Sequence, residues 1–131
     1  MGANANWEFV DGWILMSIFL ASRSSSVKLE AVFAAADAMN HAIPTQNEIS
    51  ESLSKLLAIG AVQLSENKFS IEPAHLQSIT NIYNKRGGLF ETPNKGVTWL
   101  TAIRATVPED YSTVELSEQD YSAAYERYRR T

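Results

Sequence analysis

The chain has 131 residues, of which 45% are hydrophobic and 20% are charged, and its formal net charge is −4. This composition is typical of one globular domain that buries a sizeable core without metals or disulfides. Because cysteine is absent, a disulfide framework, a thiolate zinc site and a cysteine nucleophile are excluded. The longest apolar run, residues 13–21, is too short to cross a bilayer and follows acidic residues, so we expect a soluble, cytoplasmic protein with no membrane partner.

Charge is unevenly distributed along the chain. Residues 1–73 carry four basic and eight acidic side chains, residues 74–106 carry four basic and one acidic, and residues 107–131 carry three basic and six acidic. Nucleic-acid binding depends on clustered Lys and Arg, which displace counterions from phosphate. The overall balance therefore argues against a general nucleic-acid binder, and phosphate contacts are expected to depend on the middle segment.

Two helices are expected after a lead-in of residues 1–10. Asp11 is a suitable N-cap for a mostly buried helix over residues 12–21. Ser26 is expected to cap a second helix over residues 27–40, in which apolar residues recur at helical spacing.

The third helix, residues 45–59, has the clearest start and stop signals. Thr45 and Glu48 form a T-x-x-E capping box, in which each side chain accepts a hydrogen bond from the other residue's amide. Gly60 suits the left-handed position that ends a helix. Apolar residues form one stripe, made of Ile49, Leu53, Leu56 and Leu57. Polar residues are expected to face away from the core, namely Gln46, Asn47, Ser50, Glu51, Ser54 and Lys55.

After Gly60 the hydrophobic period changes from helical to alternating. Residues 61–64 and 68–71 are expected to form a hairpin around a three-residue loop, with Asn67 in the left-handed conformation. The order helix, helix, helix, hairpin resembles the winged helix-turn-helix superfamily, most plainly over residues 56–62 and 67–71.

This resemblance implies a mainly α fold with a winged-helix core over residues 11–73 and a C-terminal helical extension over residues 74–131. In that superfamily the third helix commonly enters the DNA major groove and the hairpin wing lies along the backbone or the minor groove, while several members use the same surface to bind proteins. The segment of residues 37–45 is also similar to small bacterial winged-helix proteins with no assigned activity.

The C-terminal extension is expected to contain three more helices. The first begins near Pro73, ends at Gly87 and Gly88, and packs on the helix of residues 12–21. The second covers residues 93–104, with Thr92 as its N-cap, although the pattern of residues 97–99 also fits an extended conformation.

The last helix begins at Ser117 and runs to about Arg130. Tyr121, Tyr125 and Tyr128 share one of its faces, which suits either packing on the chain's own core or contact with a partner, including a second copy of the chain.

Enzymatic chemistry is not indicated, and neither a cofactor nor a metal is expected. Asp37 and His41 are four residues apart, but further ligands are missing, so a structural role in the turn is favoured. Gly87 and Gly88 lack the frame of a phosphate-binding loop.

Two functions remain open. The first is a transcriptional regulator that binds double-stranded DNA. Its candidate contacts are Gln46, Asn47, Ser50, Ser54 and Lys55 on the third helix, Lys68 on the hairpin, and Lys85 and Arg86 beyond it. The second is a protein-interaction or homodimerisation module that uses the same face or the tyrosine stripe. Glu51 on that face disfavours contact with phosphate.

Overall fold

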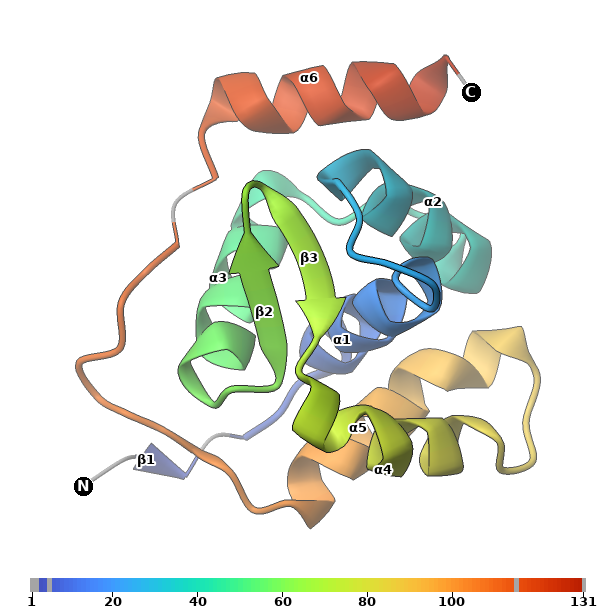
Figure 1. The fold of residues 1–131 in the computed structure, drawn as a ribbon, viewed down its shortest axis with the longest axis vertical. Coiled ribbons are helices and arrows are strands. Elements are labelled where there is room, and N and C mark those ends of the chain that lie inside the picture. Colours follow the sequence, from blue (N-terminus) through green and yellow to red (C-terminus); the bar gives the residue numbers. More distant parts are fainter. Residues whose placement is uncertain (1–2, 5, 115, 131) are drawn as a thin grey trace.

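The computed structural model describes residues 3–4, 6–114 and 116–130, with side chains from residue 6 onward. The predicted order of three helices, an antiparallel hairpin and further helices is confirmed (Figure 1). The helices are α1 (Phe9–Ala21), α2 (Leu29–Asn40), α3 (Gln46–Ala58), α4 (Pro73–Tyr83), a 3-10 turn η1 (Leu89–Glu91), α5 (Thr92–Ala102) and α6 (Glu118–Arg129). The hairpin consists of β2 (Val62–Ser65) and β3 (Lys68–Ile71), and a second, smaller antiparallel pair joins β1 (Ala3–Asn4) to β4 (Thr106–Val107).

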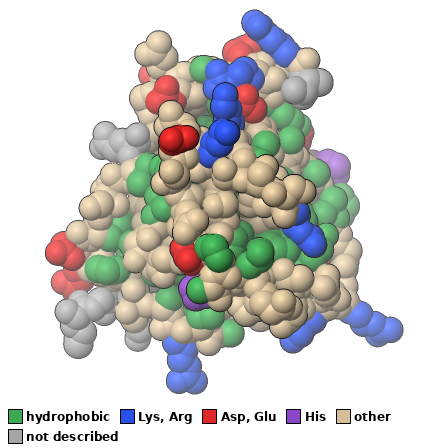
Figure 2. Space-filling model, in the orientation of Figure 1, with side chains coloured by type: hydrophobic (Ala, Val, Ile, Leu, Met, Phe, Trp, Pro, Cys, Tyr) green, Lys and Arg blue, Asp and Glu red, His purple; other side chains and the backbone are tan. Residues whose placement is uncertain are grey.

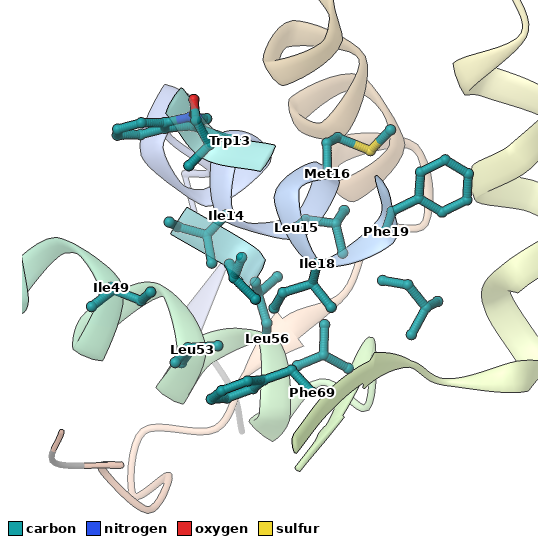
Figure 3. Close-up of a cluster of buried hydrophobic side chains, with 14 of the residues drawn as sticks. Trp13, Ile14, Leu15, Met16, Ile18, Phe19, Ile49, Leu53, Leu56 and Phe69 are labelled. Atoms are coloured by element: carbon teal, nitrogen blue, oxygen red, sulfur yellow. The ribbon is translucent and has the colours of Figure 1, made fainter. Parts of the chain in front are cut away.

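The core is built around α1, which is buried along nine consecutive residues, 11–19. A helix that is apolar around most of its circumference has to be enclosed by other elements, and α1 is enclosed by α2, α3, α5 and β3. In Figure 3 its side chains gather with Leu53 and Leu56 of α3 and Phe69 of β3. Burial of each such side chain contributes about 1.5–3 kcal/mol, so α1 is the element on which the other elements depend.

The start of α1 differs from the prediction. Its N-cap is Glu8, and Asp11 lies at the third helical position, where its Oδ2 accepts a hydrogen bond from the Glu8 amide at 3.0 Å. The assignment of Asp11 as the N-cap was therefore wrong. An acid at the third position closes a capping box from inside the helix, which leaves the rest of its carboxylate free to face α3.

The start of α2 also differs. Ser26 is exposed and does not cap this helix, whose N-cap is Lys28. Val27 instead pairs with Phe69 through two backbone hydrogen bonds, of 3.0 and 2.7 Å. Because this pairing keeps the Val27 backbone extended, the helix begins two residues later than predicted, and the hairpin is attached to the segment before α2.

The caps of α3 match the prediction. The Glu48 amide donates to Thr45 Oγ1 at 3.1 Å, and the Thr45 amide donates to Glu48 Oε1 at 2.9 Å. Gly60 has a φ of 73°, in the left-handed region that a side chain disfavours. Ile49 is fully buried on the predicted apolar stripe.

The hairpin has a two-residue turn rather than the predicted three-residue loop. Ser65 pairs with Lys68, so the turn consists of Glu66 and Asn67, with φ angles of 53° and 63°. The left-handed conformation of Asn67 is confirmed. Positive φ at both central residues gives the turn the twist of the flanking strands, which explains why the tighter connection forms.

The C-terminal helices close the other side of α1. The expectation that α4 packs on α1 is only partly met, because α5 covers most of that surface and α4 meets α1 where Tyr83 lies against Phe19, with ring centroids 5.3 Å apart. The predicted end of α4 was wrong as well, since the helix ends at Tyr83, before the two glycines. Thr92 is the first residue of α5 and not its N-cap.

The crossing of α1 and α5 is very close. Gly12 and Gly96 face each other there, and an added Cβ on Gly96 would lie 2.5 Å from the carbonyl oxygen of Gly12. The two backbones are therefore in direct contact, which is a geometry that only glycine permits on both helices.

The last helix, α6, lies across α2 and is reached by an extended segment that runs around α3 (Figure 1). Its predicted cap is confirmed, because the Asp120 amide donates to Ser117 Oγ at 3.0 Å. Ala124 is its one buried residue among those described. The helix is therefore held by partly buried tyrosine rings that pack on the core and by side-chain hydrogen bonds.

Candidate functional site

The polar face of α3 was predicted to be displayed, but the extended segment before α6 crosses it. The backbone amide of Val114 donates to Ser54 Oγ at 2.8 Å, and Gln46 Nε2 donates to the carbonyl oxygen of Leu116 at 2.8 Å. Ser54 is only 1% exposed. The expectation that Ser54 faces solvent was wrong, because a segment 60 residues further along the chain covers it.

These two contacts recognise backbone rather than side chains. Ser54 contacts the N–H of residue 114 and Gln46 contacts the C=O of residue 116, so one end of α3 binds an amide and the other binds a carbonyl of the segment before α6. The hydroxyl of Ser54 also donates to the carbonyl oxygen of Ser50 at 2.7 Å. Its lone pairs thus remain oriented toward the incoming amide.

Lys55, a predicted phosphate contact, is an ion-pair partner inside the protein. Its Nζ lies 2.7 Å from Asp11 Oδ2, and its ammonium lies 5.5 Å from the centroid of the Trp7 ring. The Asp11 side chain is 2% exposed and its other oxygen accepts a hydrogen bond from Ser52 Oγ at 2.8 Å. A buried carboxylate requires such partners, so the expectation that Lys55 faces away from the core was wrong.

The other predicted contacts are divided between two regions. Asn47 and Glu51 are exposed on α3, Ser50 is half-buried, and Lys68 is exposed on the hairpin. Figure 1 shows the turn between α4 and α5 on the opposite side of the molecule from α3.

Lys85 and Arg86 belong to that distant turn. They line a surface hollow of about 280 Å³ together with Glu91 and Lys95. Lys95 donates to the carbonyl oxygens of Tyr83 and Lys85, at 2.9 and 2.6 Å, and so satisfies the end of α4. The structure therefore does not bring the predicted basic residues together into one patch.

The tyrosine stripe of α6 contacts the chain's own helices. The hydroxyl of Tyr121 donates to the carbonyl oxygen of Pro44 at 2.7 Å, and its ring meets the edge of Phe33 at a centroid distance of 5.4 Å. The Tyr125 ring stacks on Tyr121 at 6.5 Å. Burial is the main cause that raises the pKa of Tyr121, with smaller contributions from Tyr125 and Glu48.

Tyr128 completes the stripe by donating a hydrogen bond to Asp37 Oδ2. This bond is the largest cause that raises the pKa of Tyr128, because it is made by the neutral phenol; burial and the charge of Asp37 add to it. In the last turn of α6, Arg127 Nε lies 2.9 Å from Glu30 Oε2 of α2. Three of the ties between α6 and the core are thus polar.

No group of three or more His, Asp and Glu side chains suited to a metal ion occurs within the described part of the chain. His41 ends α2 in the left-handed conformation, with a φ of 51°, and its amide donates to the carbonyl oxygen of Asp37 at 2.8 Å. Its ring lies against Phe90 at 5.0 Å.

Sequence reasoning missed three residues that define this site: Asp11 as an ion-pair partner, Val114 as a backbone donor and Glu30 as an anchor of α6. Of these, Val114 carried a weak signal, since it forms an alternating apolar pair with Leu116 just before the helix cap at Ser117. The other two depend on which helices meet.

Comparison of the chain with protein-family models, with curated proteins and with solved structures gives no match. Among the described residues, none of the helices combines the length and the apolar character that crossing a membrane requires.

Proposed function

We propose that the chain is a winged-helix protein that acts as a protein-interaction module, in which the outer face of α3 binds an extended polypeptide. The observation that carries the proposal is the pair of hydrogen bonds from Ser54 and Gln46 to the backbone of residues 114 and 116. Side chains that hydrogen-bond to the main-chain amide and carbonyl of an extended segment can bind polypeptides of many sequences, because every residue except proline carries both groups. The chain's own C-terminal segment is one such ligand, bound in cis.

The winged-helix assignment is supported by the order of elements and by the attachment of the hairpin. The backbone pairing of Val27 with Phe69 joins β3 to the segment between α1 and α2, so the hairpin is attached to the three-helix unit at Phe69.

Electrostatics favours polypeptide over phosphate as the ligand of this face. Lys55 is neutralised by Asp11, whereas Glu51 remains exposed. On the face drawn in Figure 2, Lys and Arg side chains gather near the top, where Asp and Glu side chains lie beside them, and stand apart from one another elsewhere. Affinity for a phosphate backbone requires several clustered cations.

The proposal is tested with the full chain carrying Val114→Pro, which removes the amide that donates to Ser54. A segment tethered in cis has an effective concentration in the millimolar range, so a labelled peptide of residues 108–131 should not bind the parent chain at micromolar concentration. Because the loss of one hydrogen bond weakens the tethered segment by about tenfold, the Val114→Pro chain should bind the peptide at about tenfold lower concentration than the parent chain does, as measured by fluorescence anisotropy. Failure of this peptide to bind the loosened chain would contradict the proposal.

A matched peptide separates specific from general binding. The same peptide with proline at position 114 lacks the donor and should bind the Val114→Pro chain at least about tenfold more weakly. Thr113→Pro, next to it in the exposed part of the segment, is the control for chain stiffness in the protein. Equal affinity of the two peptides would show that the amide is not recognised.

A DNA-binding regulator is the second candidate, because Asn47 in the first turn of α3 and Lys68 on the hairpin are both exposed. Contact of α3 with bases then requires the C-terminal segment to leave. The prediction is that the Val114→Pro chain binds a mixed-sequence duplex at low salt, with affinity that falls steeply as salt is added, and that the parent chain does not. Absence of binding by both chains removes this candidate.

A further inference from the structure

A cavity of about 500 Å³ lies between the segment before α6 and the elements that this segment crosses. Leu53 of α3 and Leu64 and Phe69 of the hairpin border it. Val114 and Leu116 border it from the segment. Protein interiors rarely contain a void larger than a water molecule, so the contact between the segment and α3 leaves an unusually large space.

Val114 is the residue of the segment whose size bears most directly on this space. Val114 and Leu116 are two positions apart and border the same cavity, which is the side-chain period of an extended chain. Leu116 already packs against the core. Val114 is smaller and half-buried, and the hydrogen bond from its amide to Ser54 holds residue 114 beside α3. A larger side chain at position 114 would therefore enter the space that valine leaves.

Charge gives this cavity no preference for an anion or a cation. Its wall contains two basic residues, Lys28 and Arg127, and two acidic residues, Glu30 and Asp120. The rest of the wall is mostly apolar. The wall therefore selects a ligand by apolar bulk.

We propose that the polypeptide partner of α3 is an extended segment of another protein, with an aromatic residue at the position of Val114 and an apolar residue two positions later. This inference rests on the proposed function and adds a side-chain preference to it. An aromatic ring buries more apolar area than valine does, and here it lies against Leu53, Leu64 and Phe69. A second copy of the chain is a poorer ligand, because it presents Val114 again and leaves the same space.

The first test compares labelled peptides of residues 108–131 that differ at position 114. The parent peptide and its Val114→Phe and Val114→Thr forms are titrated into the full chain carrying Val114→Pro, with fluorescence anisotropy as the readout. Burial of one methylene group is worth about fourfold in affinity, so the phenylalanine peptide should bind at least about tenfold more tightly than the parent peptide. The threonine peptide has the shape of the parent with a hydroxyl in place of a methyl group, and should bind about threefold more weakly or worse.

A Thr113→Phe peptide is the matched control for general hydrophobic attraction. Thr113 is exposed and does not border the cavity. This peptide carries the same added ring one position away, so its affinity should stay within about threefold of the parent peptide.

A variant of the wall locates the ring. Leu64 is 38% exposed, so Leu64→Trp fills the cavity from the hairpin with little change to the core. In the Val114→Pro chain it should reduce the advantage of the phenylalanine peptide to less than about threefold, while the parent peptide still binds. Circular dichroism checks that the variant is folded.

The second test needs no peptide and uses the full chain with Val114→Phe alone. If the ring fills the cavity, the segment opens less often, and the amide of residue 114 should gain about tenfold in protection from hydrogen exchange. The Thr113→Phe chain should show the same protection at residue 114 as the parent chain.

The outcomes separate this inference from the proposed function. Absence of binding by every peptide overturns both. Binding of the parent peptide with no advantage for phenylalanine, or with an equal advantage for Thr113→Phe, overturns only the side-chain preference. Unchanged protection of residue 114 in the Val114→Phe chain also overturns it.

Discussion

The close crossing of α1 and α5 can be tested by replacing Gly96 with alanine and asking whether stability rises or falls. Replacing glycine by alanine inside a helix normally raises stability by about 1 kcal/mol, because alanine has the higher helix propensity. At Gly96 the added Cβ would lie 2.5 Å from Gly12 O, 2.8 Å from Gly12 Cα and 2.8 Å from Met16 Cγ. Two of these three atoms are backbone and cannot rotate away, so we expect Gly96→Ala to lower stability.

The size of the effect follows from the required movement. Carbon atoms in ordinary contact lie about 3.5–4.0 Å apart, so α5 has to move from α1 by roughly 1 Å. Overpacking of this kind costs about 1–3 kcal/mol, and the gain in helix propensity offsets about 1 kcal/mol of it. For the upper half of that range the net loss is about 1–2 kcal/mol, or roughly 3–10 °C in Tm for a chain of this length.

Urea unfolding followed by circular dichroism measures the change in free energy of unfolding. Gly88→Ala is the control, because an added Cβ there meets nothing within 4 Å and the residue has an ordinary extended backbone. We expect it to change stability by less than about 0.5 kcal/mol. A Gly96→Ala chain as stable as the parent or more stable would refute the close crossing. The double variant with Gly12→Ala should cost less than the two single changes together, since the first already separates the helices.

Thr45→Ala removes the oxygen that caps α3 and should cost about 1 kcal/mol by urea unfolding, while Thr45→Ser should restore most of it; an unchanged Thr45→Ala chain would contradict the capping box. Lys55→Met leaves the buried carboxylate of Asp11 without its cation and should cost about 1–3 kcal/mol, and adding Asp11→Asn should recover part of this loss. Tyr128→Phe should reduce the loss of folding stability at alkaline pH. The hydrogen bond to Asp37 raises the pKa of Tyr128 above that of the unfolded tyrosine. The stability that this bond adds is therefore complete below about pH 10 and is lost as the pH rises through the folded pKa. Thermal unfolding from pH 8 to 11 checks this, and parallel profiles for parent and variant would remove Tyr128 as the cause.

Local signals predicted the fold well. The capping box at Thr45 and the positive φ of Gly60 depend on residues within one turn of the helix end, and both were read from the sequence. The errors at Asp11 and Ser26 also have local causes. In each case the helix begins at a residue two or three positions away from the predicted cap. Asp11 contacts α3, and the segment that follows Ser26 is held extended by the hairpin.

The candidate site was harder to predict because its contacts join distant parts of the chain. Gln46 and Ser54 were correctly placed on the polar face of α3, but what covers that face comes from residues 114 and 116. Helical periodicity shows which side of a helix is polar. It does not show whether that side contacts solvent or another segment of the chain, since hydroxyl and amide side chains can hydrogen-bond to water and to backbone groups alike.

The buried pair of Asp11 and Lys55 changes how the charge of α3 should be counted. In sequence the helix carries Glu48, Glu51 and Lys55, and Lys55 is the cation nearest to a predicted base-reading face. In the structure Lys55 forms an ion pair with Asp11, and the Glu48 carboxylate accepts the capping hydrogen bond, so Glu51 sets the charge of the exposed face of α3. A face with one free carboxylate and two side chains already bonded to backbone amide and carbonyl groups is better suited to polypeptide than to phosphate. The sequence of this helix resembles that of a DNA-reading helix, and the polypeptide-binding role that we propose for it rests on its hydrogen bonds to residues 114 and 116.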